Sequence, residues 1–102
     1  MKVQNMYELT DLFGSKKKVD FDNLIIGASA YIEHYLIDRC FEKKLLASQN
    51  ADIDGLYLAQ NDLNSFRFIL SRLNDPVLSK SVREKQALSI YKLMHVKVQE
   101  AV

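Results

Sequence analysis

The chain contains few of the residues that define several protein classes. It has one cysteine, Cys40, in 102 residues, which excludes an intramolecular disulfide and a cysteine-rich zinc site. Its glycines, Gly14, Gly27 and Gly55, lie far apart and cannot form a glycine-rich phosphate loop. Basic and acidic residues nearly balance, giving a formal net charge of +1, so the charge of the whole chain favours no polyanionic partner.

Long apolar runs are also missing. The most apolar stretch, 24–32, is interrupted by Gly27 and Ser29, and it is much shorter than the roughly 20 residues that a membrane span needs. Residues 1–5 run into polar residues without the apolar segment of a secretory signal. A lone cysteine in a helix-like segment fits a reducing compartment. We therefore expect a soluble, cytoplasmic protein with no membrane partner.

The scarcity of glycine and proline favours long helices over a sheet with many turns. The predicted fold class is all-α: a single helical domain over residues 1–102, built as a bundle of about four main helices with one long central helix. In the first helix, Met6, Leu9 and Phe13 form the apolar stripe. The expected helices cover Gln4–Phe13, about Asp22–Ala47, a third segment ending at about Leu73, and a last segment ending at about Glu100.

Local signals place the ends of these helices. Gly14 follows the first helix where a C-cap is expected, and Ser15–Lys18 then forms a polar linker. Pro76 ends the third helix, because the residue before a proline avoids the helical conformation. The residues that can N-cap the later helices are Asp20 or Asp22, Asp52 or Asp54, and Ser81, the last in a capping box with Glu84.

The second helix carries apolar residues on two opposite sides when it is wound at about 100° per residue. Its predicted length of about 39 Å exceeds the diameter of about 33 Å expected for a compact domain of this size. Either it bends, with Gly27 as a candidate point, or the fold is elongated, or a second chain covers the excess. We predict a non-enzymatic protein-interaction module, an adaptor or regulatory accessory protein that forms a homodimer or other homo-oligomer. The predicted interface residues are Ile26, Ala30, Ile37, Phe41, Tyr57 and Phe68.

Candidate catalytic and metal-binding residues are few. His34 and Asp38 share a helix face and could orient an imidazole or supply two metal ligands, but a metal site needs three or four. Cys40 and His34 point in different directions on the same helix, which disfavours a nucleophile and base pair. We therefore predict no catalytic, cofactor-binding or metal-binding residue. The alternative is an enzyme whose site lies between helices, around His34, Asp38 and Tyr31.

Basic residues cluster at two places in the sequence. Three consecutive lysines follow Ser15, and residues 76–102 hold more basic than acidic side chains. Such patches can neutralise phosphates without reading bases. The alternative function is therefore a nucleic-acid-binding regulator that uses these lysines and the basic C-terminal helix, although a solvated helix face or an acidic protein partner explains the same pattern. The candidate phosphate-contacting residues are Lys16, Lys17, Lys18, Lys85 and Lys92.

Overall fold

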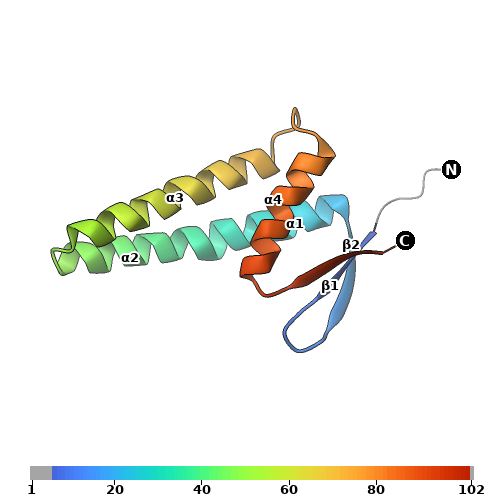
Figure 1. Ribbon diagram of the computed structural model, residues 1–102, viewed down its shortest axis with the longest axis horizontal. Helices are drawn as coiled ribbons and strands as arrows, with labels where there is room; N and C mark the ends of the chain where they lie inside the picture. Colours follow the sequence, from blue (N-terminus) through green and yellow to red (C-terminus); the bar gives the residue numbers. More distant parts are fainter. Residues whose placement is uncertain (1–5, 102) are drawn as a thin grey trace.

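The structure is a computed structural model that describes residues 6–101, and it shows an α+β fold, which corrects the predicted all-α helical bundle. Within these residues, three helical rods accompany a three-stranded antiparallel sheet (Figure 1). In chain order the elements are β1 (Met6–Thr10), β2 (Lys16–Asp20), α1 (Phe21–Tyr31), the π-helical segment η1 (Ile32–Leu36), α2 (Ile37–Gln49), α3 (Ile53–Leu73), α4 (Lys80–Leu93) and β3 (Lys97–Ala101).

The predicted first helix is wrong, because its residues form β1 and the turn that follows, and the predicted polar linker is largely β2. Residues 4 and 5, where that helix was expected to begin, lie outside the described residues. Side chains alternate between the two faces of a strand, so Tyr7 and its register partner Val19 both point into the core and are buried. Phe13, expected in the apolar stripe, is exposed at the turn. Met6, Leu9 and Phe13 have the spacing of apolar residues along one side of a helix, which is why the sequence predicted a helix here.

The C-terminal segment is a second correction. The last helix ends at Leu93 rather than near residue 100, and His95 adopts a positive φ of 58° as the chain turns into β3. β3 pairs with β1, so the strand order is β2-β1-β3. This pairing joins the two ends of the described chain. Local sequence patterns cannot reveal such a pairing, because tertiary contacts override helix and strand propensity.

The long second helix is present and spans residues 21–49 through α1, η1 and α2. Asp20 caps it, and its carboxylate accepts the backbone N–H of Asn23 at 2.8 Å. The helix continues through Gly27, and the molecule is elongated, which is one of the three expected alternatives.

The π-helical segment η1 changes the face that this helix presents. The backbone N–H of Ile37 donates to the carbonyl of Ile32, the spacing of a π-helix. A π-helical turn is wider than an α-helical turn, so it rotates the residues that follow it about the helix axis. A helical wheel drawn at about 100° per residue therefore assigns these residues to the wrong side of the helix. Tyr35 is exposed, and Ile37, which was predicted as an interface residue, is half-buried against the core.

The other two helices begin at aspartate and serine caps. Asp52, rather than Asp54, caps α3 and accepts the N–H of Gly55 at 2.9 Å. Ser79, rather than Ser81, caps α4, so the predicted capping box does not form.

Glu84, the acidic residue of that predicted box, serves the sheet instead. Its carboxylate accepts the hydroxyl of Tyr7 at 3.0 Å, which links α4 to β1. Glu84 therefore makes a long-range contact with β1, and not the contact at the helix terminus that the local pattern predicted.

The core lies where α1 and α4 pack on the inner face of the sheet and the C-terminal end of α3 packs against these two helices. Tyr91 donates its hydroxyl to the carbonyl of Leu24 at 2.8 Å. Gly27 lies against this hydroxyl, and a Cβ there would collide with it. Large side chains that are fully buried in this core are Tyr7, Leu24, Ile32, Leu73 and Ile90.

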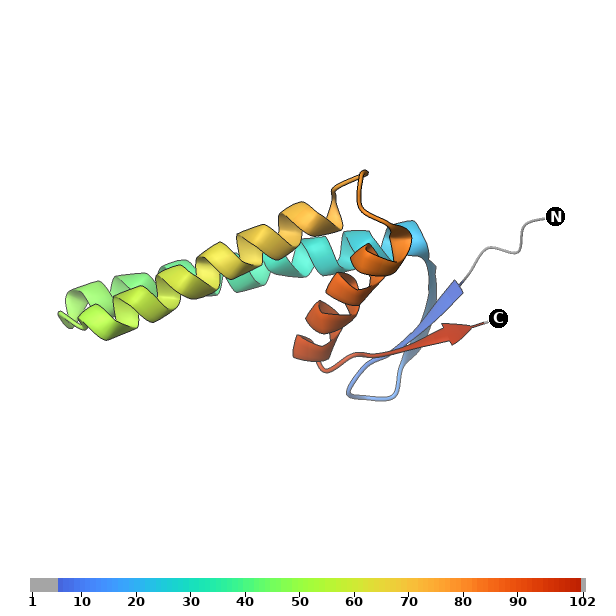
Figure 2. The same ribbon diagram turned by 45° about the horizontal axis from the view of Figure 1, so that its top comes forward.

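The molecule consists of a body and an arm (Figure 2). The body contains the sheet, α1 and α4, and the arm is the antiparallel hairpin of α2 and α3 that extends from it. The extents are 59 × 36 × 16 Å, and the radius of gyration is 16.0 Å, against about 13 Å for a compact domain. The accessible surface is 7272 Å², against about 5,900 Å² expected for this size. No other described element covers the two broad sides of the arm along most of its length.

Candidate protein interface

The interior of the arm contains mostly small side chains. Cys40 and Ala47 of α2 and Ala59 and Leu63 of α3 are buried between the helices. Small residues allow two helices to approach closely, but they bury little apolar area. The larger apolar side chains of the arm lie on its outer sides.

One side of the arm exposes five large apolar residues. Phe41 and Leu45 lie one turn apart on α2, and the residues on α3 follow the same helical spacing. Their exposed fractions run from 46% to 69%. Exposed large apolar side chains gathered on one side of a protein are typical of a contact surface. We call this surface the aromatic face; it consists of Phe41, Leu45, Ile53, Tyr57 and Phe68.

Sequence reasoning identified three residues of the aromatic face, Phe41, Tyr57 and Phe68, and missed the other two. Leu45 follows Phe41 by one turn, and Ile53 precedes Tyr57 by one turn. Helical spacing from each predicted residue was therefore the signal that could have found them.

A band of polar side chains crosses the aromatic face. Lys44 on α2 donates to the side-chain oxygen of Gln60 on α3 at 2.7 Å, and the Gln60 amide donates to Asn64 at 2.9 Å. The guanidinium carbon of Arg67 lies 5.8 Å from the centroid of the Phe41 ring, within the range of a cation–π contact. The band joins the two helices and places cations among aromatic side chains.

A pocket of about 340 Å³ opens near the tip of the arm on the same side. It is lined by Lys44, Ile53, Leu56, Tyr57 and Gln60 and is open to solvent. Helices that pack together seat a side chain of one in a hollow between residues of the other. The pocket therefore suits a side chain from a partner helix.

The opposite side of the arm offers less apolar surface. Leu46 and Leu58 are exposed there, and they line a hollow that also contains Lys43 and Asp62. Charges of both signs and fewer large apolar side chains make this side the weaker candidate.

The remaining predicted interface residues do not lie on the arm's aromatic face. Ile26 is exposed on α1 and lines a groove beside β2. Ala30 and Ile37 are half-buried, and Ile37 packs against the core. The six predicted residues therefore do not form one surface.

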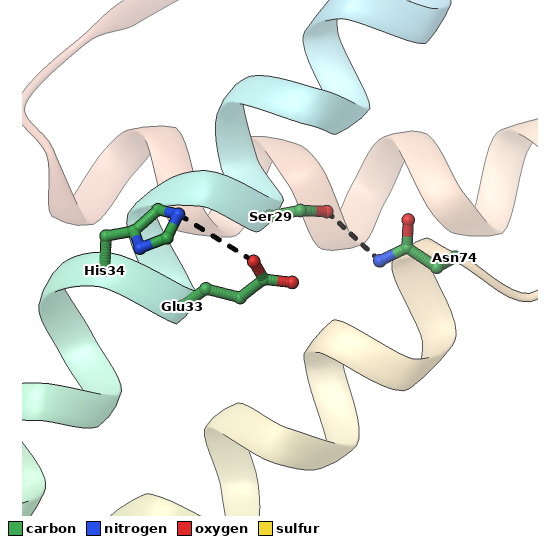
Figure 3. A network of polar contacts seen from close by, with 4 residues as sticks. All are labelled: Ser29, Glu33, His34 and Asn74. Carbon is green, nitrogen blue, oxygen red and sulfur yellow. Dashed lines mark hydrogen bonds and ion pairs between the residues drawn. The ribbon is translucent and has the colours of Figure 1, made fainter.

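His34 and Asp38 are exposed on the long helix. The Nε2 atom of His34 lies 3.9 Å from a carboxylate oxygen of Glu33 (Figure 3). Nearby, Asn74 at the end of α3 donates to Ser29 of α1 at 3.2 Å, a contact that ties the two helices together. Within residues 6–101, histidine, cysteine and carboxylate side chains do not gather into a group able to hold a metal ion.

Cys40 is separate from this pair. It is buried against α3, and burial, reinforced by the negative charge of Asp62, raises the pKa of its thiol. A thiol with a raised pKa is a weaker source of the reactive thiolate. Burial between the two helices therefore gives Cys40 a packing role.

The predicted basic residues fall on two elements. Lys16–Lys18 are exposed on β2, an edge strand of the sheet, and Lys85 and Lys92 are exposed on α4. Lys16 lies 3.8 Å from a carboxylate oxygen of Glu8. Lysines on an edge strand discourage pairing with a strand of another chain. The lysines of β2 therefore have a structural use, and contact with nucleic acid stays a prediction.

Two further findings bear on function. Among the helices of residues 6–101, none combines the length and apolar character needed to cross a bilayer. Comparisons with protein-family models, curated proteins and solved structures found no match to this chain. Its function must therefore be inferred from its own geometry.

Proposed function

We propose that this protein is a non-enzymatic, self-associating interaction module in which two copies pack their aromatic faces together. The observation that carries the proposal is an arm one helix layer deep with five large apolar side chains exposed on one side. Full burial of each such side chain is worth about 1.5–3 kcal/mol. Two arms packed face to face would form two layers around one apolar core, as in a four-helix bundle.

The surface area supports a second copy as the partner. The chain exposes 7272 Å², which is about 1,400 Å² more than a compact domain of its size. A stable interface covers about 800 Å² on each partner. The excess of the whole chain is therefore larger than the area that one partner of such an interface covers.

The polar band supports a defined packing register. In a two-fold dimer each residue that contacts a second residue is itself contacted by the same residue of the other copy. Gln60 and Asn64 carry both donors and acceptors, so their amides can pair with the same groups across the axis.

We place the dimer in the cytoplasm, as an adaptor or regulatory accessory protein, because its one thiol is free and buried.

Sedimentation equilibrium over a range of protein concentrations tests the proposal. We expect the wild type to dimerise and the double variant Phe41→Ser, Tyr57→Ser to dissociate at least about a hundredfold more readily, since each lost side chain counts twice in the dimer. Both positions are exposed in the single chain, so the fold should survive, as circular dichroism can verify.

The matched control is Val77→Ser in the connection between α3 and α4. Val77 is 88% exposed and lies outside the arm, so this variant should dimerise like the wild type. A wild type that stays monomeric at the highest concentration, or a dimer unaffected by the double variant, would overturn the proposal.

A further inference from the structure

The turn between β1 and β2 presents two apolar side chains to solvent. Leu12 is 73% exposed and Phe13 is 94% exposed. Asp11 holds the turn, because one of its carboxylate oxygens accepts the N–H groups of Phe13 and Ser15, each at 2.9 Å. Gly14 follows with a φ of 82°, a conformation that glycine adopts without strain. The turn is thus built to hold Leu12 and Phe13 outward, away from the core.

Lysines surround the base of this turn on the outer face of the sheet. Val19 points into the core, so alternation along β2 places Lys16 and Lys18 on the opposite face. Thr10 pairs with Lys16 on one side and with Lys97 of β3 on the other. Glu8 lies 3.8 Å from Lys16 and is the register partner of Lys18, and Asp11 carries a carboxylate in the turn itself. The outer face behind the turn therefore places three lysines, Lys16, Lys18 and Lys97, around one strand carboxylate, that of Glu8.

The spacing of these groups matches the depth of a lipid interface. A strand rises about 3.3 Å per residue, so Lys16 and Lys18, three and five residues after Phe13, stand at most about 10 and 17 Å behind it. Apolar groups of surface-bound proteins enter the boundary between headgroups and acyl chains by about 5–10 Å. When Leu12 and Phe13 enter to that depth, the lysines lie level with the headgroups.

We propose that the β1–β2 turn docks the protein on an anionic phospholipid surface, with Leu12 and Phe13 inserted and Lys16, Lys18 and Lys97 at the phosphates. Two signals act together, as surface anchoring requires. Burial of one large apolar side chain changes a partition coefficient by about tenfold or more. Each lysine near an anionic surface contributes about fivefold.

A nucleic acid would use the same lysines, but it fits the turn less well. An apolar wedge between base pairs must unstack them, and proteins that do this recover the cost by wrapping the bent duplex over a large basic surface. Here the cations are few and surround one narrow tip, and the whole chain has a formal net charge of +1. A lipid surface accepts an apolar tip without that cost.

This inference differs from the expectation of no membrane partner. That expectation came from the length of the apolar runs, which bears on helices that cross a bilayer and not on turns that enter its surface. It is independent of the proposed dimer, because the turn belongs to the body and the aromatic face to the arm.

The absence of tryptophan from the chain allows a direct test. The variant Phe13→Trp carries the sole tryptophan at the tip of the turn. Vesicles of equal parts phosphatidylserine and phosphatidylcholine should shift its emission to the blue, and vesicles of phosphatidylcholine alone should shift it much less. The control Val77→Trp, at another exposed loop position, should show no shift with either vesicle.

Vesicle co-sedimentation of the full chain separates the two signals. Leu12→Ser with Phe13→Ser should lower the partition coefficient at least about tenfold, and both residues are exposed, so the fold is not at risk. Lys16→Gln with Lys18→Gln should lower it by more than tenfold and weaken its dependence on salt. Lys43→Gln with Lys85→Gln removes the same charge elsewhere and should have little effect.

Several results would overturn the proposal. One is the failure of the wild type to sediment with anionic vesicles. A second is unchanged sedimentation of the Leu12 and Phe13 double variant. Retention of the wild type by duplex DNA, without vesicle binding, would assign these lysines to nucleic acid instead.

Discussion

Tyr7 illustrates how one residue can link the sheet to the helices. Its ring is buried and its hydroxyl donates to Glu84 on α4 at 3.0 Å. Burial, together with this bond to a carboxylate, raises the pKa of Tyr7 from 10.0 to about 12. The folded state therefore holds the neutral phenol more strongly than the unfolded chain does.

This pKa predicts a loss of stability at alkaline pH. Because the folded pKa lies above the unfolded one, the contribution of Tyr7 is fully present below pH 10 and is lost as the pH rises to about 12. A shift of this size corresponds to about 2–3 kcal/mol in the free energy of unfolding. Urea titrations across this pH range should show a smaller alkaline loss for Tyr7→Phe. Parallel curves for Tyr7→Phe and wild type would contradict the prediction.

At the scale of elements, the packing of α1 on α4 depends on a missing side chain. Gly27 lies within α1 and faces the hydroxyl of Tyr91, which donates to the carbonyl of Leu24. An exposed glycine in a helix costs about 1 kcal/mol relative to alanine. Glycine is nevertheless needed at position 27, because any Cβ there would collide with the hydroxyl of Tyr91.

We predict that Gly27→Ala lowers the free energy of unfolding by about 1–3 kcal/mol, the opposite of its effect at an open helix position. Urea unfolding measures the change. Adding Tyr91→Phe to Gly27→Ala removes the colliding hydroxyl and should recover part of the loss. Ser65→Ala, on the exposed side of α3, is the control and should be neutral or slightly stabilising. A Gly27→Ala variant as stable as the wild type would contradict the close packing.

The elements also show where local signals suffice. Asp20 and Asp52 cap helices as predicted alternatives, because a cap is a bond between residues three positions apart. Ser81 and Glu84 match the same kind of pattern and fail, since Glu84 binds Tyr7 from the far end of the chain. The turn of η1 has no signature in the apolar spacing, yet it decides which side of α2 faces outward.

For the whole molecule, the uneven distribution of its core has a thermodynamic consequence. The body contains the large buried side chains, whereas the arm buries chiefly cysteine, alanine and one leucine between its helices. In the proposed dimer, a second layer would add stability to an arm with so little interior. Association and folding would then be linked, because a partner that binds only the folded state stabilises that state.

We therefore predict that the melting temperature of the wild type rises with protein concentration, as differential scanning calorimetry can measure. The arm variant Tyr57→Ser should melt at a temperature that depends much less on concentration, whereas Val77→Ser should behave like the wild type. Identical concentration dependence in wild type and Tyr57→Ser would show that the aromatic face does not carry the association.

The amino-acid sequence by itself determined the long amphipathic helices, two of their caps and three residues of the aromatic face, since all of these follow from contacts within a few positions. Only the tertiary structure decided the sheet, the rotation at η1 and the arm. The reason is that β1 pairs with β3, which comes from the opposite end of the described chain. That pairing, and not a local preference, places residues such as Leu9 and Val98 against the core. The exposed turn at Phe13 likewise forms only because β1 pairs with β2. The sequence predicted a helix for the residues of β1 and a polar linker for most residues of β2.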